Sequence, residues 1–206
     1  MSNAAFTKLM IAQGLKRLLK TTSFVNVSVG DIARECKISR NTFYYHFKDK
    51  YDLISWIFYT EITSILSDDI SLGHWRDSLL SLCKYMQENR DFYLNVLEFQ
   101  GQNSFSECLM DFYQGLVAHL LFHADSQPAL SQEQIRMVSR FYAHGITGVL
   151  LDWAHNGMTA DPEPAVTMLE KLLSSDTVHQ ILSTQPKSCL LYTPVRRLLF
   201  HERFSC

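Results

Sequence analysis

Apolar residues recur along this chain with the three- and four-residue spacing of α-helices, and no stretch alternates in the manner of a β-strand. In the first segment Ile11, Leu15 and Leu18 form one stripe, while Lys8 and Lys16 fall outside it. Short polar breaks separate the periodic stretches. The pattern predicts an all-α protein with helices over about residues 6–20, 29–36, 40–47, 50–67, 74–89, 91–100, 103–123, 131–157 and 162–182.

The second and third of these helices are short and lie close together. Ser28 has the character of an N-cap, because Asp31 follows three residues later and can complete a capping box. Ser39 is expected to cap the third helix after a tight connection. Two short helices joined by a short turn, with a supporting helix in front, describe a helix-turn-helix.

The third helix has two chemically different faces. Phe43 and Phe47 lie four residues apart and are expected to anchor it in the core. The opposite face carries groups suited to DNA, since Arg can bond guanine bidentately, Asn can bond adenine, and Tyr commonly reaches phosphates. The candidate DNA-contacting side chains on this face are Arg40, Asn41 and Tyr44, flanked by Thr42 and Tyr45.

Two helix starts add candidate phosphate contacts. Lys50 begins the helix predicted over 50–67, where its ammonium and the helix N-terminus can face the same phosphate. Ser28, Val29 and Gly30 open the second helix, where backbone N–H groups can approach the DNA strand.

The charge of the chain is divided unevenly. Residues 1–60 contain nine Lys or Arg against four acidic residues, whereas residues 61–206 contain ten against 17. A basic front suggests contact with a polyanion, although chance clustering on a solvated face is the alternative. With 206 residues, 47% of them hydrophobic, the chain can bury a substantial core.

Several classes of protein are disfavoured. No apolar run approaches the roughly 18–20 residues needed to span a bilayer, and the N-terminus lacks the pattern of a signal peptide. Five scattered cysteines without a CxxC pair favour reduced thiols in a cytoplasmic protein, and no cofactor or metal is expected. His119 and His123 have the spacing of metal ligands but lack an evident third ligand, so packing is preferred. No catalytic motif is present, and an enzyme is not expected.

The stretch from Ser28 to Leu53 resembles the DNA-binding signature of TetR/AcrR-type transcriptional regulators, with its T-F-Y-x-H-F-x-x-K-x-x-L pattern. The resemblance implies recognition-helix contacts from the residues named above, phosphate contacts from His46 and Lys50, and a dimer bound to a palindromic double-stranded operator. Gly30 departs from the pattern, because many relatives carry a polar or basic side chain there.

The rear of the chain resembles the same family more weakly. Residues 141–157 are similar to the penultimate helix of such regulators, where small residues permit close packing across a homodimer. The dimerisation residues that this implies are Gly145, Gly148, Leu151 and Trp153. The combined pattern is most similar to regulators of dihydroxyacetone-kinase operons, some of which are activators controlled by a protein partner.

These observations predict three parts: a DNA-binding domain over 1–50, a helical regulatory and dimerisation domain over 51–183, and a tail of unknown role over 184–206. A dimeric repressor released by a small ligand is the first expectation. The alternative is an activator or adaptor that responds to a protein partner and takes no small ligand. Side chains that could line a ligand cavity, with core packing as the alternative, are Tyr85, Tyr93, Phe112, Tyr113, Tyr142 and His144.

Overall fold

A computed structural model describes residues 3–65, 75–99, 104–122 and 131–173, and every regular element within these ranges is a helix. The helices begin and end within a few residues of the sequence prediction. They are α1 (Asn3–Leu18), α2 (Val29–Glu35), α3 (Arg40–His46), α4 (Lys50–Ile65), α5 (Trp75–Glu88), α6 (Arg90–Leu97), α7 (Phe105–Phe122), α8 (Gln132–His155) and α9 (Glu163–Leu173). The second half of the predicted 162–182 helix and the tail predicted over 184–206 lie outside the described residues, as does His123.

The predicted helix caps are confirmed. The Ser28 hydroxyl accepts from the Asp31 amide, and the Asp31 carboxylate accepts in return from the Ser28 amide. Ser39 caps α3 through the Thr42 amide at 3.0 Å. Helix α8 ends at Asn156, and Gly157 follows with a φ of +76°, the left-handed conformation that commonly terminates a helix.

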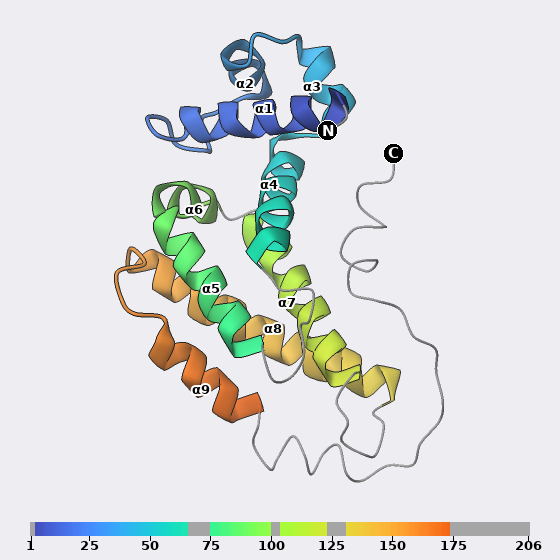
Figure 1. Cartoon of the computed structure of the whole chain (residues 1–206), viewed down its shortest axis with the longest axis vertical. Helices are drawn as coiled ribbons and strands as arrows, with labels where there is room; N and C mark the ends of the chain where they lie inside the picture. The colour runs from blue at the N-terminus through green and yellow to red at the C-terminus, as the bar shows by residue number, and fades with distance from the viewer. Residues whose placement is uncertain (1–2, 66–74, 100–103, 123–130, 174–206) are drawn as a thin grey trace.

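Helices α1 to α3 form one end of the molecule, and α4 leads from them into the remaining helices (Figure 1). Helices α7 and α8 run alongside each other, and α9 packs on α5. Buried residues of both ends, from Ile11 on α1 to Leu169 on α9, belong to one continuous hydrophobic core. The three N-terminal helices are therefore packed against the rest of the protein as well as joined to it.

Candidate nucleic-acid interface

Helix α3 is held by two phenylalanines, as its spacing predicts. Phe43 and Phe47 are buried, with their ring centroids 5.8 Å apart. Helix α1 and the end of α2 also approach each other closely. The glycine at position 14 permits this approach, since a Cβ there would collide with the Cys36 sulfur. This small core fixes the orientation of the opposite, outward face of α3.

The outward face of α3 carries the side chains predicted to contact DNA. Arg40 and Asn41 are exposed at its first turn. Tyr44 is 55% exposed and Tyr45 82% exposed, which is far more than aromatic side chains of the core show. The half-buried Thr42 lies beside Ser39, with 2.9 Å between the two hydroxyl oxygens. A large aromatic and polar surface is thus displayed on a rigidly anchored helix.

His46 lies at the end of α3, between the exposed Tyr45 ring and Lys8 of α1. Burial, and then the positive charge of Lys8, lower the pKa of the His46 imidazole below its usual value. The neutral ring can still bond a phosphate oxygen through an N–H group. A phosphate beside it would raise its pKa again, because a nearby anion favours the imidazolium.

The start of α2 is occupied by its own cap. The Ser28 amide donates to the Asp31 carboxylate at 3.0 Å and the Ser28 hydroxyl donates to it at 2.6 Å. These hydrogen bonds hold the pKa of the Asp31 carboxyl below its usual range. The amides of Val29 and Gly30 follow at the first turn, where a helix offers no internal acceptor.

The Lys50 ammonium is turned inward onto the loop between α1 and α2. It donates to the carbonyls of Phe24 at 2.8 Å, Val25 at 3.2 Å and Val27 at 2.8 Å, and lies 4.5 Å from the centroid of the Phe24 ring. Burial lowers the pKa of this ammonium. Since an ammonium has three N–H bonds, all three are directed at carbonyls, whereas the sequence predicts that this group contacts a phosphate.

The same loop is bound from the other side by α6. The Asn95 side chain accepts from the Phe24 amide at 2.6 Å and donates to the carbonyls of Leu19 at 3.1 Å and Thr22 at 3.3 Å. The Phe24 ring packs edge-on against Tyr51 of α4 and Phe99, with centroids 5.4 and 6.2 Å apart. The loop between α1 and α2 is therefore clamped between the helix-turn-helix and the rear helices.

A second polar junction centres on Glu61 of α4. Lys16 of α1 forms an ion pair with this carboxylate, and the Tyr93 hydroxyl of α6 lies 3.5 Å from its other oxygen. Tyr85 of α5 also hydrogen-bonds to Glu61, and burial together with this carboxylate raises the pKa of the Tyr85 phenol. Neither Asn95 nor Glu61 stands out in the sequence, because their partners lie far away along the chain and no local spacing marks them.

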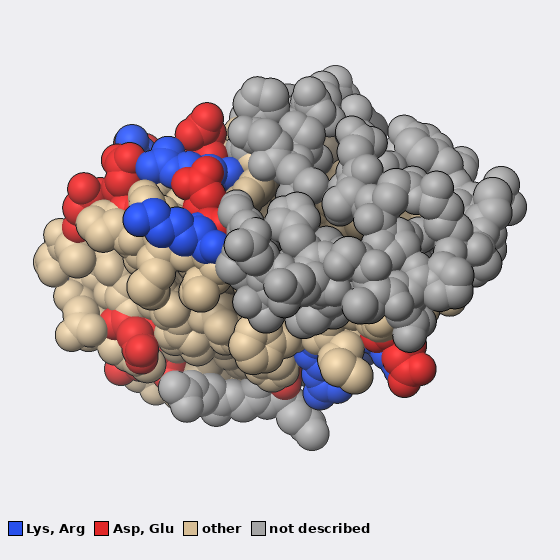
Figure 2. All heavy atoms as spheres, turned by 90° about the horizontal axis from the view of Figure 1, so that it is seen from below, with Lys and Arg blue, Asp and Glu red and all other residues tan. Residues whose placement is uncertain are grey.

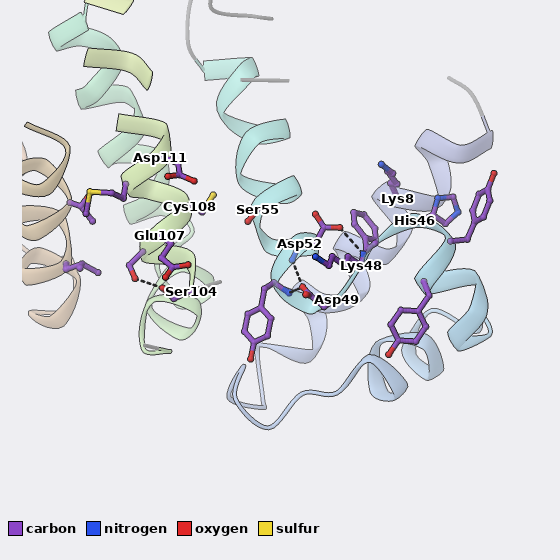
Figure 3. Close-up of a pocket in the computed structure, with 18 of the residues that line it drawn as sticks. Lys8, His46, Lys48, Asp49, Asp52, Ser55, Ser104, Glu107, Cys108 and Asp111 are labelled. Carbon is purple, nitrogen blue, oxygen red and sulfur yellow. Dashed lines mark hydrogen bonds between the residues drawn. The ribbon is translucent and has the colours of Figure 1, made fainter. Parts of the chain in front are cut away.

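A groove of about 1060 Å³ separates the helix-turn-helix from α7 and α8. Figure 3 shows Lys8, His46 and the start of α4 on one wall, and Glu107 and Asp111 of α7 on the other. His144, Thr147 and Leu151 of α8 also line it. Helix α4 crosses beside this groove, so a change in its angle would alter the separation of the two walls (Figure 1).

Of the side chains predicted to line a ligand cavity, those of Tyr85, Tyr93, Phe112 and Tyr113 lie in or against the aromatic core, whereas those of Tyr142 and His144 lie on α8. Tyr93, Phe112 and Tyr113 are completely or almost completely buried in the aromatic core, and the Phe112 ring packs edge-on against Phe58 with centroids 5.3 Å apart. Tyr142 is half-buried and donates to the Leu172 carbonyl of α9 at 3.1 Å. His144 is exposed on α8 and borders the groove. The Tyr113 hydroxyl has no hydrogen-bond partner among the described residues.

The side chains predicted to form a dimer interface occupy different faces of α8. Among the described residues, and apart from the neighbouring backbone of α8 itself, a Cβ on Gly145 or on Gly148 would meet no atom within 4 Å. Leu151 is half-buried against the core, and the Trp153 indole donates to the Ala160 carbonyl at 2.8 Å. The exposed apolar residues that share the glycine face by helical spacing are Met137, Phe141 and Val149. Met168 and Leu172 are exposed on α9.

The end of the molecule opposite the helix-turn-helix carries charges of both signs. Figure 2 shows this end, where Lys and Arg lie among Asp and Glu over its described part instead of forming a continuous basic patch. Within the described ranges, no helix combines the length and apolar content needed to cross a membrane. The described residues also contain no group of three or more His, Cys, Asp or Glu placed to hold a metal ion.

Two family models match the chain. Residues 73–175 match a transcriptional regulator C-terminal region of the TetR type, and residues 11–55 match the bacterial regulatory proteins of the tetR family. The chain belongs to the TetR family. It is a transcriptional regulator with a DNA-binding helix-turn-helix, and the all-α, two-part fold predicted from the sequence is confirmed.

Relatives within the TetR family agree with the predicted subgroup. The HTH-type dhaKLM operon transcriptional activator DhaS of Lactococcus lactis subsp. lactis (strain IL1403) is 28% identical over 127 residues, which are 62% of this chain and 67% of DhaS. A solved structure titled dihydroxyacetone kinase operon activator DhaS is 25% identical, with a TM-score of 0.61 over 86% of this chain and 98% of that one. NalD, the secondary repressor of the MexAB-OprM efflux pump in Pseudomonas aeruginosa, is 19% identical with a TM-score of 0.50 over 84% of this chain and 96% of NalD, and it shares the fold.

Proposed function

We propose that this TetR-family regulator binds a palindromic operator as a homodimer, with residues 1–50 as the DNA-binding domain and residues 51–183 as the regulatory and dimerisation domain. The observation that carries the proposal is the outward face of α3, where Arg40 and Asn41 are exposed beside two exposed tyrosines while two buried phenylalanines hold the helix. An α-helix presented in this way enters the major groove, where Arg and Asn discriminate bases.

The contacts divide by chemistry. Arg40 and Asn41 read base edges, while Thr42, Tyr44, Tyr45 and His46 flank them and reach phosphates or bases. At the start of α2 the amide of Val29 approaches a phosphate, next to Ser28, whose own amide is bound to the Asp31 carboxylate. Lys50 acts as a positioning residue, since its ammonium holds the α1–α2 loop through three carbonyls.

The dimer forms through the face of α8 that carries Gly145 and Gly148. No described residue outside the adjoining turns of α8 has an atom near the position of a Cβ on either glycine, which supports close approach of a second copy to the helix backbone. Phe141 is 73% exposed on this face and supplies apolar area to bury. Two helix-turn-helix units held by one interface match the two half-sites of a palindrome.

Control of this dimer acts through α4 and the clamped α1–α2 loop. A signal that binds one arrangement of the rear helices better than another shifts the population by its differential affinity. The first mode is a repressor released by a small ligand. The second is an activator without a small ligand, controlled by a protein partner, and two observations favour it: the likeness to DhaS, and the packing of Tyr93, Phe112 and Tyr113 against neighbouring core side chains.

The test is selection of genomic fragments by the purified protein, titrated at two salt concentrations. Recovery of a palindrome, with an affinity that falls steeply with salt, supports an operator-binding dimer. A folded dimer that enriches no sequence would overturn the proposal in favour of an adaptor. Transcription from the recovered promoter in vitro then separates the modes, because an activator raises and a repressor lowers the yield of transcript.

A further inference from the structure

Gly30 and Arg40 lie against each other across the helix-turn-helix. Gly30 is the second residue of α2 and Arg40 the first residue of α3. A Cβ placed on Gly30 would lie 3.0 Å from the Arg40 Nε and 3.1 Å from its Cζ, and closer still to Nη2. The guanidinium therefore occupies the space that any other side chain at position 30 would fill.

No ion pair holds the guanidinium in this place among the described residues. The carboxylate next to Gly30, Asp31, is bound to the Ser28 cap and to Arg34 at 2.9 Å. The N-terminus of α2 also carries a partial positive charge, which does not attract a cation. The absence of a side chain at Gly30 is what leaves room for the Arg40 guanidinium to lie against α2.

We propose that Gly30 is a specificity-determining residue that positions the guanidinium of Arg40 for one base pair of each operator half-site. The inference rests on the proposed operator binding. A bidentate bond to guanine requires the planar guanidinium to meet O6 and N7 together, so a displacement of about 1 Å removes it. A side chain at position 30 would occupy the space of the Arg40 guanidinium and displace it. Only one of the two side chains can therefore present its end to the DNA from this place.

The fold itself does not need a glycine at this position. Gly30 has no positive φ, since Gly157 is the only glycine with one among the described residues. The three nearest atoms to the added Cβ all belong to the flexible end of Arg40 and none to the backbone. Alanine is also a better helix former than glycine. Gly30→Ala should consequently leave the fold intact while it moves the guanidinium.

The experiment compares Gly30→Ala, Arg40→Ala and the double variant on the selected operator and on every single-base-pair variant of one half-site. We expect Gly30→Ala to weaken operator binding by about 5- to 100-fold and to relax the same base pair as Arg40→Ala, the range set by loss of one bidentate contact. The double variant should bind no more weakly than Arg40→Ala alone. Affinity for random DNA and its salt dependence should stay unchanged, and the melting temperature of Gly30→Ala should not fall.

Additive losses in the double variant, or relaxation at two different base pairs, would overturn the inference. A second measurement does not depend on DNA: the Arg40 Nε–H resonance of the free protein, assigned with Arg40→Ala, should shift in Gly30→Ala. An unchanged resonance contradicts the contact itself. If the resonance shifts while the wild-type protein selects no operator, the proposed function fails and the Gly30–Arg40 contact stands.

Discussion

The side-chain oxygen of Asn95 on α6 accepts a 2.6 Å hydrogen bond from the backbone amide of Phe24, in the loop between α1 and α2. One residue of the rear helices thus holds the backbone that leads into the helix-turn-helix. With the two bonds from its amide nitrogen, Asn95 uses both ends of its side chain on that loop. These hydrogen bonds connect α6 to the loop by a route separate from the covalent connection through α4.

Replacement of Asn95 by Ala is expected to lower the free energy of unfolding by about 1–3 kcal/mol, because it leaves a part-buried amide and two carbonyls without partners. Urea unfolding measures the loss. Asn156→Ala is the matched control, since the Asn156 side chain makes one exposed hydrogen bond, to the Asp152 carbonyl four residues earlier. Equal effects of the two substitutions would show that the α6 contact contributes no particular stability.

Replacement of Lys50 by Met keeps much of the apolar stem and removes the ammonium. We expect a loss of about 1.5–3 kcal/mol in the free energy of unfolding, since three carbonyls lose a charged donor. The salt dependence of DNA binding should stay unchanged, because a positioning residue neutralises no phosphate. Lys48→Met, which alters an exposed lysine two residues away, controls for stability. If the slope of log binding constant against log salt concentration falls by about one in Lys50→Met, Lys50 contacts a phosphate as the sequence predicts.

Acidification should affect His46 in a defined direction. Its folded pKa lies below the unfolded value of about 6.5, so the unfolded chain binds more protons between the two values. The stability contributed by the neutral imidazole is complete above about pH 6.5 and is lost as the pH falls toward the folded pKa. His46→Gln should flatten this dependence, whereas His155→Gln should not.

Operator binding should reverse the perturbation of His46. A phosphate beside the imidazole stabilises its protonated form, so NMR titration should give a higher pKa in the complex than in the free protein. Operator affinity then increases as the pH falls through that range. An unchanged titration in the complex would mean that His46 does not contact a phosphate.

A substitution on the exposed face of α8 should weaken dimerisation without destabilising the folded monomer. Phe141→Glu introduces a charge where the single chain leaves the ring 73% exposed, so the melting of the monomer should change little. Sedimentation should show a large increase in the dimer dissociation constant, and operator affinity should fall with it. Phe6→Glu alters a similarly exposed ring on α1 and should leave the dimer intact. A dimer that survives Phe141→Glu places the interface elsewhere.

The buried hydroxyl of Tyr113 offers a test of the core. It has no hydrogen-bond partner among the described residues, and the side chain is completely buried. Tyr113→Phe should therefore be neutral or raise the free energy of unfolding by about 1–2 kcal/mol, because an unsatisfied polar group is removed from an apolar site. Destabilisation by a similar amount would reveal a polar partner at this position, such as a bound water.

Features that depend on local spacing were predictable from the sequence. The caps at Ser28 and Ser39 and the buried pair Phe43 and Phe47 are set by residues within four positions of one another, and the structure confirms them. Features that depend on tertiary contacts were not. The three carbonyls that bind Lys50 lie 23 to 26 residues earlier in the chain, so the sequence does not reveal them, and the phosphate contact expected of Lys50 stays a prediction.

The aromatic residues of α7 and the glycines of α8 likewise separate what local spacing predicts from what only tertiary contacts decide. Helical spacing does not separate a core aromatic such as Phe112 from a surface residue such as His144, because the faces of α7 and α8 are chosen by packing between helices. The Trp153 indole donates to a carbonyl in the segment that follows α8, a contact that its sequence neighbours do not reveal, and its role in a dimer interface stays a prediction. Gly145 and Gly148 lie on one face of α8 with no described side chain against them, and their place in a dimer interface, which the family resemblance implies, stays a prediction.

The three carbonyls around the Lys50 ammonium also give the protein a built-in reporter. An amine must be deprotonated and accessible before it can be acylated, and this one is held by three oxygens beneath an aromatic ring. The rate at which Lys50 is acylated therefore reports how frequently the hydrogen bonds between its ammonium and the α1–α2 loop break. Labelling of Lys50 in the presence and absence of operator DNA would time that local opening in the intact regulator.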